Sequence, residues 1–160
     1  MDGIEFLLNE RISDEKLGQY ESAYRERALL RTSKAESLSD DDANVYFQYA
    51  LALVQSPYKS DWKRGRNLFQ DLYTLNPKDE QAKRDYLFYC SIAEIKLHNY
   101  KEALKFANSI LYIEPFNSQA QALKSYVENK QNKDMIVGSA VVGGVAVLGA
   151  ALLGGLLAKK

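Results

Sequence analysis

The chain has 160 residues, 46% of them hydrophobic, and its 21 basic and 21 acidic side chains give a formal net charge of zero at pH 7. A balanced charge provides no field that would attract a polyanion, so we do not expect nucleic acid as a partner. The single cysteine, Cys90, cannot form a disulfide within the chain, which agrees with a reducing compartment.

The N-terminus carries acidic residues close to a short apolar run, unlike a secretory signal or a transit peptide. We predict that residues 1–12 form an apolar arm, whose large apolar side chains are Ile4, Phe6, Leu7 and Leu8. Ser13, followed by two acidic residues, predicts the start of the first long helix. The folded domain is expected to span residues 13–128.

Apolar residues recur at helical spacing throughout this domain, and all three prolines fall between periodic segments: Pro57, Pro77 and Pro115. Ser39 and Asp42 resemble a capping box at the start of a second long helix. The same kinds of signal predict four further helices, at about 61–75, at about 79–97, after Asn99, which has capping-box spacing to Glu102, and after Asn117. The sequence therefore predicts an all-α, six-helix bundle.

Two parts of the domain repeat each other. Segments 62–77 and 100–115 superpose at a constant offset, which aligns Gly65 with Ala103. A small residue at this position lets one helix approach its partner closely. The unit resembles the tetratricopeptide repeat, a helix-turn-helix of about 34 residues. We therefore expect two degenerate repeat hairpins of this type within the bundle.

The C-terminal segment 135–158 is uncharged, with Ser139 as its only polar side chain. As a helix it would be roughly 36 Å long, enough to cross the hydrocarbon core of a bilayer. We predict a C-terminal transmembrane helix there that anchors the chain in a lipid bilayer. It follows a polar juxtamembrane segment, 129–134, and precedes a basic targeting tail, Lys159 and Lys160.

Small residues within this predicted anchor have two interpretations. Ala140 and Gly144, for example, have the four-residue spacing at which transmembrane helices approach closely, so the chain would form a homo-oligomer through its anchor. Alternatively, glycine and alanine keep the segment moderately hydrophobic, and this is the interpretation we prefer.

The predicted helix 79–97 is apolar on two faces. One face carries Tyr86, Cys90 and Ala93, and the nearly opposite face carries Phe88, Ile92 and Ile95. In helical-repeat domains such a second face lines a concave surface, so we expect a groove shared with the second long helix, whose groove residues would be Val45, Gln48 and Ala52. Three alternatives follow: a groove open to partners, a face permanently buried by the arm or the first long helix, or an arm that yields to a partner.

Residue types that carry catalysis are sparse. His98 is the only histidine and is expected in a turn, and Cys90 is expected on a core face. One histidine and one cysteine cannot assemble a metal cluster of ordinary type, and no glycine-rich phosphate loop occurs. We expect no enzyme activity, cofactor, metal or small-molecule substrate.

Four stretches together resemble the mitochondrial fission 1 family: the opening LNERISDEKLGQYESAY, the helix YFQYALAL, the run KRDYLFYCSIAEIKLHNYKEALKF and the Gly/Ala/Val-rich tail with its basic end. The resemblance implies a tail-anchored protein of the mitochondrial, and often peroxisomal, outer membrane, with its N-terminus in the cytosol. It implies a receptor that recruits a dynamin-related GTPase, directly or through adaptor proteins. A tail-anchored receptor for other clients, such as precursor proteins or chaperones, is the alternative.

The same resemblance implies where a partner would bind. It places four residues of the helix 79–97 on a concave binding strip: Asp85, Leu87, Ile92 and Ile95. It also likens the arm to a fungal type that folds over this strip.

Overall fold

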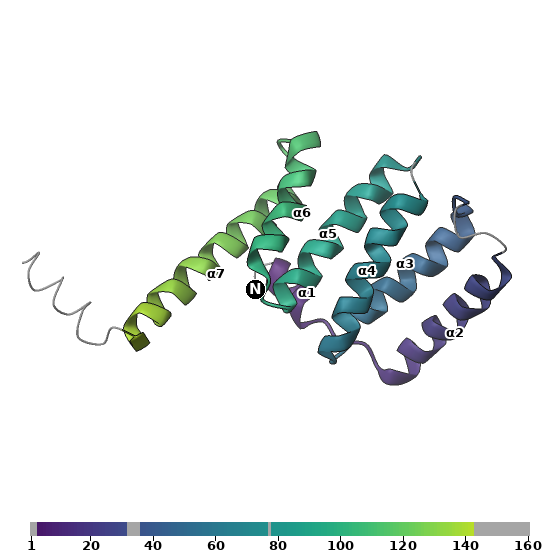
Figure 1. Ribbon diagram of the computed structural model, residues 1–160, viewed down its shortest axis with the longest axis horizontal. Coiled ribbons are helices and arrows are strands. Elements are labelled where there is room, and N and C mark those ends of the chain that lie inside the picture. Colours follow the sequence, from purple (N-terminus) through teal and green to yellow (C-terminus); the bar gives the residue numbers. More distant parts are fainter. Residues whose placement is uncertain (1–2, 32–35, 77, 143–160) are drawn as a thin grey trace, which may run out of the picture.

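The computed structural model of the chain describes residues 3–31, 36–76 and 78–142, except for the side chains of 137–142. The regular structure of this part is entirely helical (Figure 1), which confirms the all-α prediction for the described residues. Seven helices occur there: α1 Gly3–Asn9, α2 Asp14–Leu30, α3 Asp40–Gln55, α4 Lys59–Leu75, α5 Glu80–Lys96, α6 Tyr100–Ile113 and α7 Ser118–Val142.

The predicted count of six helices was wrong, because the arm is itself helical. It forms α1, which is seven residues long, and the Glu10 N–H extends it by donating to the Phe6 carbonyl at 3.0 Å. A helix this short is unstable alone in water, so its packing must stabilise it. Ile4 is buried, and Leu7 and Leu8 pack against the core. The packing that makes the arm helical therefore comes from distant parts of the chain.

Side-chain caps fix the starts of four of the described helices, including α7, where Asn117 accepts from the Ala120 N–H at 2.9 Å. Ser13 accepts from the Lys16 N–H at 3.3 Å, and Ser39 accepts from the Asp42 N–H at 3.1 Å, as predicted. Asp79 caps α5 in the same way. Asn99 does not cap α6, contrary to the prediction that its spacing from Glu102 favoured. Its amide donates instead to the Glu94 carboxylate at 2.8 Å.

The two repeat hairpins are α3–α4 and α5–α6, stacked side by side (Figure 1). Gly65 of α4 lies directly against α3, and a Cβ there would be 2.9 Å from the Ala50 carbonyl oxygen. Ala103 of α6 is fully buried, and its carbonyl accepts a hydrogen bond from the Ser91 hydroxyl at 3.0 Å. Small residues at the aligned positions thus permit the close approach that the repeat predicts.

α5 lies at the centre of the domain, where it packs against α1, α3, α4, α6 and α7. α7 closes the stack with three fully buried side chains, Ala120, Leu123 and Val127, and then continues through the predicted juxtamembrane segment to Val142. No helix within the described ranges is long and apolar enough to cross a membrane. Most of the predicted anchor, residues 143–158, lies outside those ranges.

Candidate partner-binding site

The second apolar face of α5 is buried. Phe88, Ile92 and Ile95 are 7%, 1% and 4% exposed, and they belong to one continuous apolar core. On the other side of the helix, Tyr86, Cys90 and Ala93 are buried as well. A central helix that is apolar on both faces needs a separate cover for each, and the repeat partners α4 and α6 supply only one.

The arm contributes to the other cover, together with α3 and α7, which also pack against α5. α1 packs against α5 and α7 (Figure 1), and its Ile4 belongs to the same core as Phe88 and Ile92. Leu7 and Leu8 are half-buried against that core, whereas Phe6 is 58% exposed. Three of the four predicted arm residues therefore face the core. We call the surface of α5 beneath α1, with Phe88, Ile92 and Ile95, the arm-covered face.

α3 carries the other predicted groove residues and packs against α5. Val45 and Gln48 are half-buried, and Ala52 is 1% exposed. Val45 and Gln48 therefore retain surface that a partner could contact.

Asp85 lies in a shallow depression of about 260 Å³ between the first halves of α3 and α5, where Phe47 and Asn76 also line the wall. Burial raises the pKa of the Asp85 carboxyl, and the nearby Arg84 guanidinium partly offsets this effect. No ion pair to Asp85 occurs among the residues that the structure describes. A half-buried carboxylate of this kind is typical of functional sites as well as of structural networks.

Leu87 lies on a different surface from Asp85. It lines an opening of about 430 Å³ bounded by α4 and α6, together with Phe69, Tyr73 and Phe106. A helix turns about 100° per residue, so side chains two positions apart point nearly opposite ways. The structure therefore does not bring Leu87 together with the other residues of the predicted binding strip.

The end of α3 holds a cluster of contacts that the sequence did not indicate. Residues 10–13, which connect α1 to α2 and which we call the strap, cross this end, and the Ile12 N–H donates to the Gln55 carbonyl at 3.1 Å. The Lys96 ammonium donates to the Val54 carbonyl, and the Trp62 indole donates to the Ser56 carbonyl at 2.7 Å. The last carbonyls of a helix lack partners within it, and here three separate elements satisfy them.

Lys96 is the residue of this cluster that sequence reasoning missed. A lysine in the last turn of a helix is ordinarily a solvated partner of the helix dipole. The signal that could have identified it is its position between two apolar residues, Ile95 and Leu97, both of which are buried.

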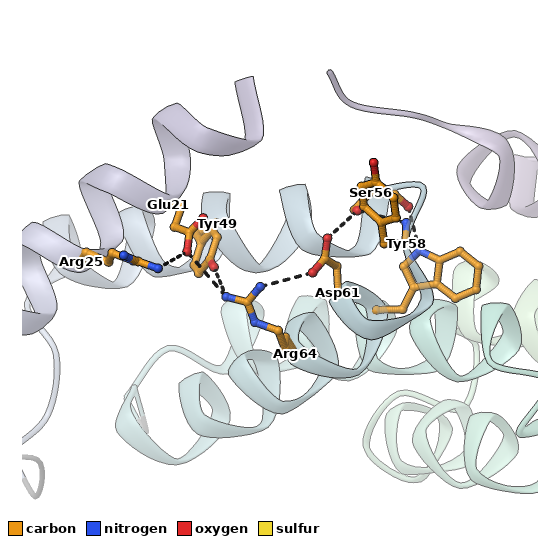
Figure 2. A network of polar contacts seen from close by, with 8 residues as sticks. Glu21, Arg25, Tyr49, Ser56, Tyr58, Asp61 and Arg64 are labelled. Atoms are coloured by element: carbon orange, nitrogen blue, oxygen red, sulfur yellow. Dashed lines mark hydrogen bonds and ion pairs between the residues drawn. The ribbon is translucent and has the colours of Figure 1, made fainter. Parts of the chain in front are cut away.

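A polar network positions α2 beside α3 and α4 (Figure 2). Arg64 donates to the Tyr49 hydroxyl at 2.6 Å and pairs with Asp61 at 3.2 Å and with Glu21 of α2 at 3.7 Å. Asp61 in turn accepts from the Ser56 hydroxyl at 2.6 Å. These contacts direct α2 onto α3, so the arm, rather than the first long helix, is the cover that the structure places on α5.

The few side chains that could be reactive lie in positions where they are inert. Burial raises the pKa of the Cys90 thiol to about 12, and His98 is exposed in the turn after α5. No group of three or more His, Cys, Asp and Glu side chains that could hold a metal occurs in the described ranges. The arrangement supports binding of another chain, not bond-making chemistry.

Comparisons with known proteins agree with this architecture. A model of the Fis1 C-terminal tetratricopeptide repeat matches residues 84–136. The mitochondrial fission 1 proteins of Rattus norvegicus and Homo sapiens are 38% and 37% identical over 144 residues, which cover 89% of this chain and 88% of each relative.

A crystal structure of yeast Fis1 in complex with an Mdv1 fragment has the same fold. It superposes with a TM-score of 0.67 at 23% identity, covering 84% of this chain and 96% of that chain. The chain therefore belongs to the mitochondrial fission 1 protein family, whose members are helical-repeat adaptors of mitochondrial fission and not enzymes.

Proposed function

We propose that the chain is a tail-anchored receptor that recruits the organelle-division machinery to the outer membrane of mitochondria, and also to peroxisomes. In this proposal the arm-covered face and the adjoining surface of α3 bind an adaptor, or a dynamin-related GTPase directly. The observation that carries the proposal is that a short helical arm, which lies outside the two repeat hairpins, packs against α5 and shares a core with its second apolar face.

The arm is weak enough to be displaced. Ile4 is the one residue of α1 that is fully buried, and burying such a side chain contributes about 1.5–3 kcal/mol. Leu7 and Leu8 add part of this amount each, but ordering the arm costs conformational entropy at every residue. A partner segment that presents several apolar side chains at helical spacing would therefore compete with α1 for the same face.

An adaptor as partner is supported by the yeast neighbour, which was crystallised with an Mdv1 fragment. The proposed groove residues that remain accessible in the closed arrangement are Val45, Gln48 and Asp85. They border the arm-covered face from α3 and from the first half of α5. A partner would contact these residues first and reach Phe88, Ile92 and Ile95 after the arm has moved.

The proposed anchor holds the receptor at the membrane surface. α7 continues without a break from the domain through 129–134 and into the first residues of the apolar segment. This continuity supports an anchor at 135–158 that ends in Lys159 and Lys160, with the domain on the cytosolic side. At a membrane surface even a weak partner gains from a high effective concentration, and self-association of anchors would raise this further.

Mitochondrial shape in cells that lack the chain tests the proposal. Loss should lengthen the mitochondrial tubules, and full-length chain should restore them. Val45→Arg, which places a charge beside the arm-covered face, should fail to restore them at matched expression. Asn108→Arg on the exposed side of α6 is the matched control and should restore them. Unchanged tubules on loss would instead favour a receptor for other clients.

A further inference from the structure

Lys96 is a buried cation without an anionic partner. Its side chain is 8% exposed, its ammonium donates to the Val54 carbonyl, and the Trp62 ring centroid lies 4.8 Å away. No carboxylate lies within ion-pairing distance of it in the part of the chain that the structure describes. An ammonium removed from water and left unpaired costs free energy, which a carbonyl and an aromatic face offset only in part.

The strap lies within electrostatic reach of the Lys96 ammonium. Of the charged groups that act on Lys96, Arg11 and Glu10 both belong to the strap, and Arg11 has the larger effect, which is unfavourable to the ammonium. Among the described residues, no charged group of another element shifts the pKa of Lys96. The last turn of α3 contains no ionisable residue, and α4 presents the neutral Trp62 ring, while Asp61 is held by Ser56 and Arg64.

We propose that Lys96 promotes release of the arm. Closing the strap buries the Lys96 ammonium beside Arg11, and the free-energy cost of this burial keeps the arm bound weakly enough for a partner to displace it. The inference rests on the proposed function, because it assumes that the arm must leave α5 for a partner to bind. It assigns Lys96 a role opposite to that of a simple latch. Its hydrogen bond to Val54 joins α5 to the end of α3 that the strap crosses, but its charge opposes closure.

The direction of the pH dependence follows from linkage. Burial lowers the pKa of the Lys96 ammonium to about 8 in the closed arrangement, from an ordinary value of 10.5. With the strap lifted, the pKa returns toward the ordinary value, so above pH 8 the closed form binds fewer protons than the open form. Raising the pH from 7 to 9 should therefore favour closure about tenfold, and below pH 7 the effect should vanish.

Hydrogen exchange at the Ile12 amide measures closure directly, because this N–H is bonded to the Gln55 carbonyl only when the strap is closed. The experiment uses the full chain in phosphatidylcholine nanodiscs, with exchange corrected for the intrinsic rate at each pH. Protection at Ile12 should rise about tenfold between pH 7 and pH 9. In Lys96→Met the protection of the Ile12 amide should already be higher at pH 7 than in the unchanged chain, and it should not change with pH. Lys101→Met, which changes an exposed lysine at the start of α6, should behave like the unchanged chain.

Two results would overturn the proposal: protection that does not change with pH in the unchanged chain, or Lys96→Met protection below that of the unchanged chain, which would make Lys96 a latch. If Lys96→Met loses its cooperative unfolding transition, the pH series of the unchanged chain decides alone, with the Ile92 amide of α5 as internal reference. No partner is present in this experiment. Its failure would therefore leave the receptor function standing, and failure of the receptor function would leave this result unaffected.

Discussion

Gly65 determines how closely the first repeat hairpin can pack. A Cβ at this position would lie 2.9 Å from both the Ala50 carbonyl oxygen and the Val54 Cγ2, and 3.1 Å from the Leu53 Cβ. The same stretch of α3 ends in the carbonyls that bind Lys96, Ile12 and Trp62. Any separation of α4 from α3 would therefore also disturb the end of α3 to which the strap binds.

Gly65→Ala should destabilise the domain by about 1–3 kcal/mol, because the added methyl group forces two packed helices apart. Gly18→Ala is the matched control, since Gly18 lies in α2 with no atom near its Cβ position. That substitution should stabilise by about 0.5–1 kcal/mol through helix propensity. Denaturant unfolding of both variants measures the difference, and equal stabilities would show that α3 and α4 do not approach as described.

At the level of elements, α2 is the least anchored of the long helices in the repeat bundle. None of its residues is fully buried. It is held by the Tyr24 ring, which lies 4.7 Å from the Tyr46 ring and 4.8 Å from the Tyr49 ring, and by exposed ion pairs such as Arg27 with Asp42. Exposed ion pairs contribute about 0–1 kcal/mol each, so the aromatic contacts carry most of the attachment.

We expect α2 to open locally before the rest of the bundle. Its central amides should exchange hydrogen at least tenfold faster than those of α5, whose residues lie in the core. Tyr24→Ala should accelerate exchange in α2 and leave α5 unchanged, whereas Tyr112→Ala, at a 90% exposed position, should change neither. Equal acceleration of α2 and α5 by Tyr24→Ala would mean that the two helices unfold as one unit.

Element boundaries could be predicted from the sequence because their causes are local. Ser13 and Ser39 cap the helices that they precede, and Pro57 and Pro115 fall in turns. The helical state of the arm could not be predicted, because α1 is stabilised by contacts with α5 and α7, which lie far along the chain. Asn99 was misread for a different reason: the Glu94 carboxylate, five residues earlier in the chain, is buried and accepts from its amide.

At the level of the whole molecule, the two-repeat stack presents α5 at its centre and leaves one of its faces to the arm (Figure 1). The two apolar faces of α5 were predictable from periodicity, and Phe88, Ile92 and Ile95 lie together as expected. The elements that cover these two faces were not predictable, because periodicity shows that a face is apolar but does not show which element packs against it. Leu87 lies apart from the strip because the helical twist directs it toward α4 and α6.

The central claim is that the arm and a division partner compete for the arm-covered face. Ile4→Asp removes the buried anchor of α1 and places a charge where the core is apolar, so it should keep the arm open. Val45→Arg leaves the arm in place and obstructs the face from α3. Each variant must retain the cooperative unfolding transition of the unchanged chain, because Ile4 belongs to the continuous apolar core and Val45 lies on a helix that packs against α5.

The most direct measurement counts foci of a fluorescent dynamin-related GTPase on mitochondria in cells that express each variant at equal level. Ile4→Asp should increase the number of foci severalfold, Val45→Arg should reduce it, and the double variant should match Val45→Arg, because an open arm cannot help when the face is blocked. If Ile4→Asp leaves the foci unchanged, or if the double variant recruits as strongly as Ile4→Asp alone, the arm and the partner do not share this face.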